Sequence, residues 1–469
     1  MRIKRISKVI IFCVILVLFL NYIYKILSWK DTAGAYYSSM NSFYDLEEDL
    51  VDVLFLGSSH CYCSVNNALL WDEHGIGSFN LAISGQDLAS SYYCMVEALK
   101  TQNPEVICVE MYGTTFHGYL VEGNLYRNTL PYRMSVNAYN VVKNIVSEEK
   151  QKDILLRWPI IHTRYAELQK EDFVESRVPY IGYQPEFRVG YVEELNPYNG
   201  EEALPIEAEE EKWLRKIIAL AEEADIQLCF FVAPYVLNEN LHKNYNYVEQ
   251  IAKENDVPFI NMADMQEELG LDLSQDFIDW AHTNYYGAAK VTGFLGRFLK
   301  SNYDLPDRRG DERYALWDEN SRVNARKFLN QRLSETWDIN EYFDMIDDAE
   351  DYTIVVATSG NYYNQEVNLY EYMTKLGIGD EFYTSDGMWV IDNREIVGKS
   401  NGEDYFMFME LEAGDLAVNS TNGIKNIVID RQSYYKALNG INVVIYDNVL
   451  GEVIDVVGFD AVNQYACIR

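Results

Sequence analysis

The stretch Val51-Asp-Val-Leu-Phe-Leu-Gly-Ser-Ser-His60 decides the fold of the larger part of this chain. Its first six residues are largely apolar, which is typical of a buried strand, and the following glycine ends the run. The next two serines then lie just past the carboxyl end of the strand. Because open parallel sheets bind ligands at this edge, the hydroxyl of Ser59 is the first candidate for chemistry.

Strand-like and helical segments alternate after this stretch. Strands are expected at residues 51–56, 79–83, 106–109, 226–233 and 258–260, and helices at 87–100, 208–224, 248–254 and 286–299. This alternation predicts a parallel sheet covered by helices on both faces. The tyrosine- and proline-rich stretch of about 112–206 interrupts the rhythm. We expect it to be an insertion over the active-site edge.

A second motif, Asp279-Trp-Ala-His282, lies more than two hundred residues downstream. It places a carboxylate three residues before an imidazole. A serine, a histidine and an aspartate are the nucleophile, general base and orienting group of acyl transfer, which predicts these roles for Ser59, His282 and Asp279. Ser58 is the alternative nucleophile, and Asp276 is a poorer partner for the histidine. The structural alternative is that both serines only cap the following helix.

Together, the two motifs resemble the first and last motifs of the SGNH/GDSL hydrolase superfamily, over about residues 50–303. In that family the nucleophile follows a strand in a Gly-Asp-Ser turn, and Asp-x-x-His lies near the end of the domain. Here Ser58 takes the position of the family's aspartate. The Gly-Ser-Ser variant looks like the DltD-like and alginate O-acetylation-like branch, whose members act on cell-envelope polymers. The resemblance implies a flavodoxin-like three-layer α/β domain.

The resemblance also implies an oxyanion hole formed by the backbone N–H groups of Ser59 and Gly85. The glycine ends the segment Asn80-Leu-Ala-Ile-Ser-Gly85. The third motif of the family usually adds an asparagine side chain, which this chain lacks, since the third strand ends Val109-Glu-Met-Tyr-Gly113. Removing one such donor typically costs about 2.7–4 kcal/mol of transition-state stabilisation. His60, Asn80 and Gln86 are candidate substrate contacts, with structural roles as the alternative.

Composition and the motifs missing from the sequence argue against several classes of function. The net charge of −34 argues against nucleic-acid binding, which needs a basic surface. The seven cysteines form neither a disulfide framework nor a zinc pattern. Phosphate loops and dinucleotide fingerprints are absent from the sequence. We therefore expect no metal and no cofactor.

The N-terminus predicts a membrane anchor. Basic residues at positions 2, 4, 5 and 8 precede a mostly apolar run from 9 to 24. The run is just long enough to span a bilayer, and the basic flank predicts an inside N-terminus with the bulk of the chain outside. A cleaved signal peptide is the alternative, with Thr32-Ala-Gly-Ala35 as the nearest candidate cleavage site.

These observations predict four segments: an anchor at 1–30, an SGNH hydrolase-like domain at 31–303, a linker or helical segment at 304–346, and a β-rich α+β accessory domain at 347–469. The segment Asn439-Gly-Ile-Asn-Val-Val-Ile-Tyr-Asp447, with Gly451-Glu-Val-Ile-Asp455 and Phe459-Asp460, is similar to the interleukin-like EMT inducer (PANDER-like) domain. This resemblance covers about 340–469 and implies a binding or accessory module.

The resulting expectation is an extracytoplasmic, membrane-anchored O-acyltransferase that acetylates a cell-surface polysaccharide through the Ser-His-Asp triad. The resemblance implies that glycan and a membrane-bound acyl-donor protein as partners. A carbohydrate esterase with the same triad is one alternative. A catalytically inactive glycan-binding or envelope-assembly protein is the other, and the geometry between Ser59, His282 and Asp279 separates it from the enzymes.

Overall fold

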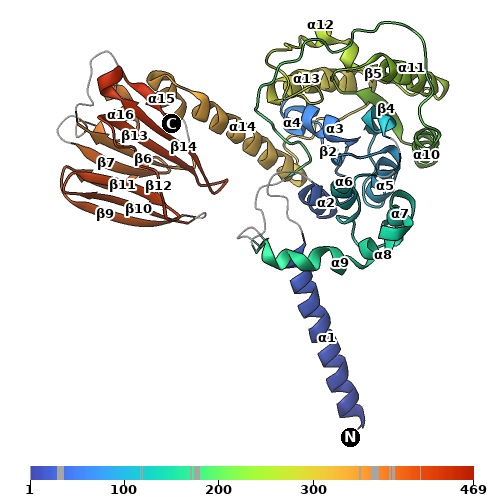
Figure 1. Cartoon of the computed structure of the whole chain (residues 1–469), viewed down its shortest axis with the longest axis horizontal. Coiled ribbons are helices and arrows are strands. Elements are labelled where there is room, and N and C mark those ends of the chain that lie inside the picture. The colour runs from blue at the N-terminus through green and yellow to red at the C-terminus, as the bar shows by residue number, and fades with distance from the viewer. Residues whose placement is uncertain are drawn as a thin grey trace. The chain divides into compact units, whose positions relative to one another are not determined.

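The chain forms two compact units, Met1–Arg322 and Val323–Arg469, in a computed structural model (Figure 1). The structure describes residues 2–28, 36–116, 118, 120–168, 172–173, 180–347, 350–360, 369–379, 382, 386–411 and 414–469. The boundary between the units falls inside helix α14 (Ala315–Glu335). The predicted domain limits at residues 30, 303 and 346 stay predictions.

The first unit is built on a parallel five-stranded sheet. Its strands are β1 (Val53–Leu56), β2 (Ser78–Asn80), β3 (Val106–Glu110), β4 (Gln227–Val232) and β5 (Phe259–Asn261). Their order is β2-β1-β3-β4-β5, and every pair is parallel. This is the flavodoxin-like order. The predicted α/β class is therefore confirmed, and β1 lies inside the sheet, beside the point where the order reverses.

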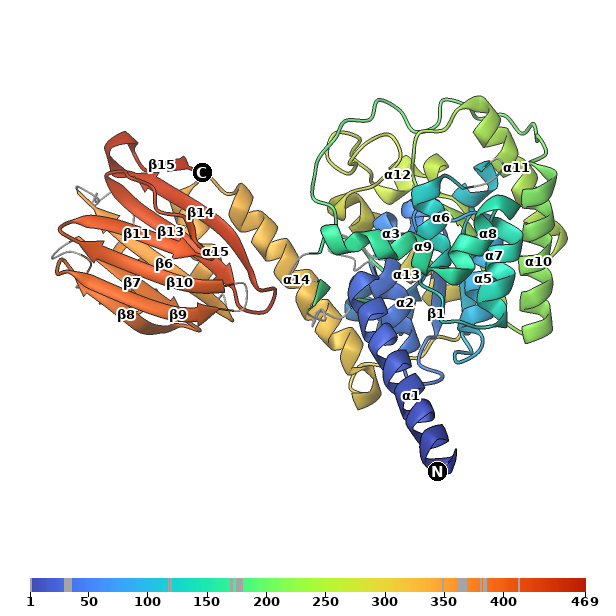
Figure 2. The same ribbon diagram turned by 60° about the horizontal axis from the view of Figure 1, so that its bottom comes forward.

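Helices cover both faces of this sheet (Figure 2). Successive side chains of a strand point to opposite faces, so Leu54 packs into one core and Phe55 into the other. The first core includes residues of α5 (Leu88–Ala98), α10 (Ala208–Ala224) and α11 (Glu239–Glu254). The second includes residues of α3 (Ser59–Ser64), α4 (Asn67–His74) and α13 (Tyr285–Asn302). Burial on both faces explains why the strands read as continuous apolar runs.

The predicted insertion after β3 is partly helical. It contains the short 3-10 helix η1 (Met111–Thr115), then α6 (Glu122–Thr129), α7 (Val136–Ile145), α8 (Glu148–Leu156), α9 (Trp158–Ile161) and η2 (His162–Ala166). An extended stretch at 180–206 leads to α10. Since the insertion leaves the carboxyl end of β3, it begins at the same sheet edge as the Gly-Ser-Ser turn.

Helix α1 (Arg2–Leu27) precedes the sheet. Its segment Lys8–Leu27 has a mean hydropathy of 2.5, and within it only Leu27, at the carboxyl end, is buried. By length and composition this segment can cross a membrane. A signal sequence near an N-terminus has the same character, so the helix is either an anchor or a signal sequence.

The second unit is rich in strands, as predicted, and these strands pair antiparallel. A six-stranded sheet has the order β15-β14-β13-β6-β7-β8, and a four-stranded sheet has the order β12-β11-β10-β9. Strand β6 (Tyr352–Ser359) alternates its side chains between two cores. Ile354 packs with helices α15 (Ile339–Asp347) and α16 (Leu369–Lys375). Val355 packs against the four-stranded sheet. The unit is thus layered as helices, sheet and sheet.

The remaining strands of this unit are β7 (Gly387–Asp392), β8 (Glu395–Asn401), β9 (Tyr405–Leu411), β10 (Gly414–Thr421), β11 (Ile424–Ile429), β12 (Gln432–Ser433), β13 (Gly440–Asp447), β14 (Glu452–Asp460) and β15 (Ala466–Ile468). The central strand β13 is buried along its whole length, because it pairs with β14 and β6 and its side chains enter the cores on both faces of the sheet.

Candidate active site

Ser59 is held at the carboxyl end of β1 by the turn that begins helix α3. Gly57 has a φ of +148°, and a Cβ there would lie 2.6 Å from Cβ of Glu110. Only glycine fits this close approach. Ser58 caps α3 by accepting a hydrogen bond from N of His60 at 3.2 Å. The turn therefore fixes Ser59 as the first residue of the helix, where its side chain is partly exposed.

The two serines of the turn have different surroundings. Ser58 is fully buried, and its hydroxyl donates to Oε2 of Glu110 at 3.1 Å. Glu110 ends strand β3, and its Oε1 accepts a hydrogen bond from N of Tyr112 at 2.9 Å. These bonds make Ser58 part of the support of the turn and leave Ser59 as the accessible hydroxyl.

His282 connects Ser59 to Asp279. Its Nε2 lies 2.8 Å from Oγ of Ser59, and its Nδ1 lies 3.0 Å from Oδ1 of Asp279. An ionised carboxylate only accepts hydrogen bonds, so Nδ1 carries the ring hydrogen of the neutral imidazole. Nε2 then offers a lone pair, and the hydroxyl of Ser59 donates to it. The structure thus brings the three predicted residues into one hydrogen-bonded chain.

Asp279 also shapes the loop that carries His282. Its Oδ1 accepts bonds from N of Ala281 at 2.8 Å and from N of His282 at 3.0 Å. Partial burial acts to raise the pKa of Asp279. The backbone donors and the imidazole outweigh it and hold that pKa below its usual value. The carboxylate therefore stays ionised as an acceptor for Nδ1.

Asp276, the poorer partner in the sequence, has a separate structural role. Its buried carboxylate accepts a bond from N of Asp272 at 2.7 Å and pairs with Nζ of Lys290 at 2.6 Å. Lys290 lies on α13, so this pair ties the start of the loop to the helix that follows it. Asp276 and Asp279 thus have different tasks in this loop, since Asp279 contacts His282 and Asp276 anchors the loop.

The second predicted oxyanion donor lies on a turn joined to the nucleophile turn. N of Ile83 donates to O of Gly57 at 3.0 Å, and N of Gln86 donates to O of Ile83 at 2.9 Å. Gly85 in this turn has a φ of +65°. Within the described part of the chain, the N–H groups of Ser59 and Gly85 have no hydrogen-bond acceptor. Both donors are therefore free for an external oxygen.

Helix α6 of the insertion braces this turn and brings a further amide to it. Asn128 Nδ2 donates to O of Ser84 at 3.1 Å. A Cβ on Gly85 would lie 2.1 Å from Nδ2 of Asn124. Because N and Cβ on one Cα are about 2.5 Å apart, this Nδ2 lies at most about 4.6 Å from N of Gly85. The Oδ1 of Asn124 faces Oγ of Ser84 at 3.5 Å, which turns its NH₂ group toward the glycine.

The three predicted substrate contacts lie beneath the site. His60, Asn80 and Gln86 are buried. The ring of His60 stacks on Tyr112 at 3.8 Å and lies 5.2 Å from the ring of His282. Burial, with a smaller effect of His282, holds the pKa of His60 well below its usual value, so its ring is neutral. Direct substrate contact is a prediction that this placement does not support.

Sequence reasoning did not assign a role to two neighbouring groups, Glu110 and Asn124. Glu110 follows a predicted strand, so the sequence indicates that it lies at the same sheet edge as Ser59. Nothing in the sequence indicates its hydrogen bond to Ser58. Burial raises the pKa of Glu110 to about 7, although hydrogen bonds from N of Tyr112 and Oγ of Ser58 oppose this. Asn124 lies in the irregular insertion, where no periodic pattern links it to Gly85. Among the described residues, no cluster of His, Cys, Asp and Glu side chains suits a metal ion.

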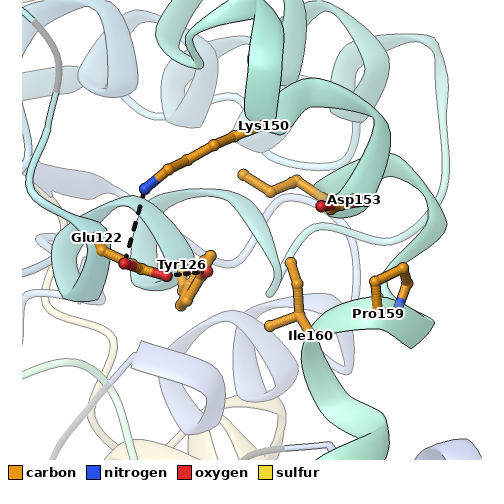
Figure 3. A pocket seen from close by; sticks show the side chains of 7 residues that line it. Glu122, Tyr126, Lys150, Asp153, Pro159 and Ile160 are labelled. Carbon is orange, nitrogen blue, oxygen red and sulfur yellow. Dashed lines mark hydrogen bonds and ion pairs between the residues drawn. The ribbon is translucent and has the colours of Figure 1, made fainter.

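A cavity of about 390 Å³ lies on another face of α6 (Figure 3). Lys150 points toward Glu122 there, with 3.7 Å between Nζ and Oε2, and Tyr126 donates to the same carboxylate. The triad does not line this cavity. Its lining residues come from α6, α8 and α9, and are Glu122, Tyr126, Lys150, Asp153, Ile154, Pro159 and Ile160.

Among known proteins, similarity to this chain is found only in solved structures. No family model and no curated protein matches the chain. A proposed acylhydrolase from Bacteroides fragilis is 10% identical over 58% of this chain and 99% of its own, with a TM-score of 0.29. A GDSL-like lipase from Bacteroides thetaiotaomicron is 9% identical over 56% and 98%, also with a TM-score of 0.29. A gut microbial diltiazem-metabolizing enzyme is 14% identical over 54% and 47%, with a TM-score of 0.28.

Proposed function

We propose that this chain is a serine-dependent enzyme of acyl esters, with Ser59 as nucleophile, His282 as general base and Asp279 as its orienting group. One observation carries the proposal: Nε2 of His282 lies 2.8 Å from Oγ of Ser59 while its Nδ1 contacts Asp279. Two residues more than two hundred positions apart meet at hydrogen-bond distance, at the sheet edge where ligands bind.

The reaction follows from these contacts. As Oγ of Ser59 attacks the acyl carbonyl carbon, Nε2 of His282 takes the hydroxyl proton. The carbonyl oxygen becomes an oxyanion, and we assign its binding to the N–H groups of Ser59 and Gly85 and the NH₂ group of Asn124. The intermediate then expels the leaving alcohol, which receives the proton from His282, and the acyl group stays on Ser59.

The acyl-enzyme is next attacked by an acceptor hydroxyl. His282 takes the acceptor's proton, the bond from the acyl carbon to the acceptor oxygen forms as the bond to Oγ breaks, and Ser59 regains its proton. If the acceptor is water, the enzyme is an esterase. If it is a sugar hydroxyl, the enzyme is an O-acyltransferase. The side chains of Asp279 and His282 are 47% and 26% exposed, so water reaches the site of the chain alone. This exposure favours ester hydrolysis.

O-acyl transfer to a cell-surface polysaccharide is the second candidate function, and sequence features favour it. The Gly57-Ser58-Ser59 turn resembles the DltD-like and alginate O-acetylation-like branch of the SGNH/GDSL superfamily. The apolar helix α1 would anchor the chain with its bulk outside the cell. In this function a membrane-bound acyl-donor protein supplies the acyl group, and the PANDER-like C-terminal module binds or presents the glycan.

The test measures the covalent intermediate. The full chain in detergent is incubated with an activated acetyl ester, and intact mass is recorded for wild type, Ser59→Ala and Ser58→Ala. We expect an acetyl adduct in wild type and its loss in Ser59→Ala. Ser58→Ala should keep an adduct, because Ser58 supports the turn from within the core. An adduct that persists in Ser59→Ala overturns the assignment of the nucleophile.

Partitioning of the adduct then separates the two functions. Acetylated enzyme is exposed to water alone or to water with a purified cell-surface polysaccharide, and free acetate and polymer-bound acetate are measured. Release as acetate in both cases identifies an esterase. Acetate that becomes polymer-bound identifies a transferase. An absent adduct, together with no labelling by a fluorophosphonate, would instead favour a non-enzymatic glycan-binding protein.

A further inference from the structure

The carboxyl end of α1 is bound by a buried charged pair from the insertion. The last carbonyl groups of a helix have no partner within the helix. Arg164 Nη1 donates to O of Leu27 at 2.9 Å and to O of Ser28 at 2.7 Å. Its Nη2 donates to Oδ1 of Asp172 at 2.9 Å, and both side chains are nearly buried. This arginine therefore closes α1 and joins it to η2.

A second arginine binds the preceding turn of α1. Arg157 Nη1 donates to Oη of Tyr24 at 2.9 Å, and its Nη2 donates to O of Tyr132 at 2.5 Å. Arg157 lies between α8 and α9 and has a φ of +60°. Figure 1 shows α9 at the end of α1 that is remote from the N-terminus. Residues 156–166 are thus fixed where α1 ends.

The same short segment exposes large apolar and aromatic side chains. Leu156 is 55% exposed, Trp158 is 36% exposed and Tyr165 is 72% exposed. A single exposed apolar residue on a soluble surface needs no explanation. Here three exposed apolar or aromatic residues flank the two arginines that bind the end of α1. This helix is apolar enough to cross a membrane. Tryptophan and tyrosine are the residues enriched where a membrane meets water.

Charge around this segment differs in sign from the rest of the chain. Residues 122–164 hold seven Lys and Arg against four Asp and Glu, although the whole chain has a net charge of −34. Most of these basic side chains are exposed. A basic surface is attracted to anionic lipid headgroups, while a strongly acidic protein is repelled by them. The net positive charge of residues 122–164 therefore favours contact with anionic lipid headgroups where α1 would leave the bilayer.

We propose that residues 156–166, with Leu156, Trp158 and Tyr165 as its contacts, form a membrane-interface surface that lies in the headgroup region of an anionic bilayer. The proposal rests on α1 being the retained anchor and not on the chemistry at Ser59. The surface begins two helices after α6, which braces the Ser84–Gly85 turn. The insertion consequently connects the proposed oxyanion turn to the proposed membrane-interface surface.

The test uses the full chain in vesicles and a spin label at single cysteines. Cys13→Ala and Cys467→Ala first remove the two cysteines that are not buried. Leu156→Cys and Tyr165→Cys then report on the surface. Tyr191→Cys is the matched control, because this tyrosine of the same unit is 74% exposed and lies outside the segment. Vesicles are made of phosphatidylcholine alone or with phosphatidylglycerol.

Collision with oxygen, which dissolves in lipid, is compared with collision with a water-soluble nickel complex. We expect labels at 156 and 165 to collide more with oxygen, increasingly so with phosphatidylglycerol, and the label at 191 to collide more with nickel. If both surface labels match the label at 191, the proposal is wrong. It is equally wrong if they are shielded from both reagents, since that indicates contact with protein. Circular dichroism verifies folding, and no outcome depends on activity at Ser59.

Discussion

Replacement of Asp279 by asparagine tests the proposed triad through its most exposed member. Oδ1 of Asp279 accepts three hydrogen bonds, from N of Ala281 at 2.8 Å, from N of His282 at 3.0 Å and from Nδ1 of His282 at 3.0 Å. An asparagine keeps an oxygen at this position, so the loop and the orientation of the ring are expected to persist. The variant then lacks the negative charge beside the imidazolium that forms during catalysis.

The size of the loss follows from how exposed this charge is. Two unit charges 3.0 Å apart attract by about 1.4 kcal/mol at the dielectric constant of water and by about 5.5 kcal/mol at the value typical of partly buried pairs. Because the carboxylate is 47% exposed, we place the loss near the lower limit, at about 1.5–3 kcal/mol. This corresponds to a fall of about 10- to 150-fold in kcat/KM. In a buried triad the same change lowers kcat by about 10⁴-fold.

The assay is hydrolysis of a p-nitrophenyl acetate series by the full chain in detergent, with thermal unfolding of each variant measured in parallel. Asp272→Asn is the matched control, because this exposed carboxylate on the same loop bonds only to its local neighbours. The control should keep wild-type kcat/KM. A loss below about twofold in Asp279→Asn would remove Asp279 from the triad. A loss near 10⁴-fold would refute the argument from exposure.

Three further outcomes are expected. Asn124→Ala should lower kcat/KM about 10-fold or more through loss of an oxyanion donor beside Gly85, with an unchanged Tm, whereas equal activity would exclude that role. Burial raises the pKa of Glu110 to about 7, so the folded state holds a proton that the unfolded state releases above about pH 4.5. The free energy of unfolding should therefore fall by about 3 kcal/mol as the pH rises from 4.5 to 7, and urea unfolding of Glu110→Gln at both limits should lack this part of the slope. Lys290→Met should lower the free energy of unfolding by about 2–4 kcal/mol because it leaves the buried Asp276 without its cation, while activity per folded molecule should not change.

The parallel α/β class could be predicted because the strands carry a strong local pattern, whereas the order of the strands could not. Burial on both faces makes them short apolar runs between helices, and a parallel sheet covered by helices is the fold that such a pattern permits. The two motifs around Ser59 and His282 could be paired from the sequence because each of them lies next to a recognisable interruption of the strand and helix pattern. What the sequence could not supply is the distance between them, which the fold sets at 2.8 Å.

The burial of two candidate substrate contacts, His60 and Asn80, could not be predicted from their nearness to the site in the sequence. His60 follows Ser59, but adjacent residues of a helix point about 100° apart. Because α3 begins at Ser59 and exposes its hydroxyl, the next side chain turns inward and stacks on Tyr112. Asn80 is buried at the end of β2 for a similar reason, since it continues a strand that is covered on both faces. Asn124, by contrast, reaches Gly85 only through the packing of α6, for which the sequence holds no local signal.

The exposure of the site bears on the choice between esterase and transferase. An acyl-enzyme on Ser59 lies beside His282, whose side chain is 26% exposed and therefore accessible to water, so the isolated chain should lose its acyl group by hydrolysis. Efficient transfer to a sugar requires that water be displaced from this opening. The described residues of the insertion do not close it, because Asp279 and His282 remain accessible. A transferase function would therefore need a partner or the glycan itself to cover the site. The proposed membrane-interface surface would hold the chain beside the bilayer, where a membrane-bound acyl donor can act as that cover.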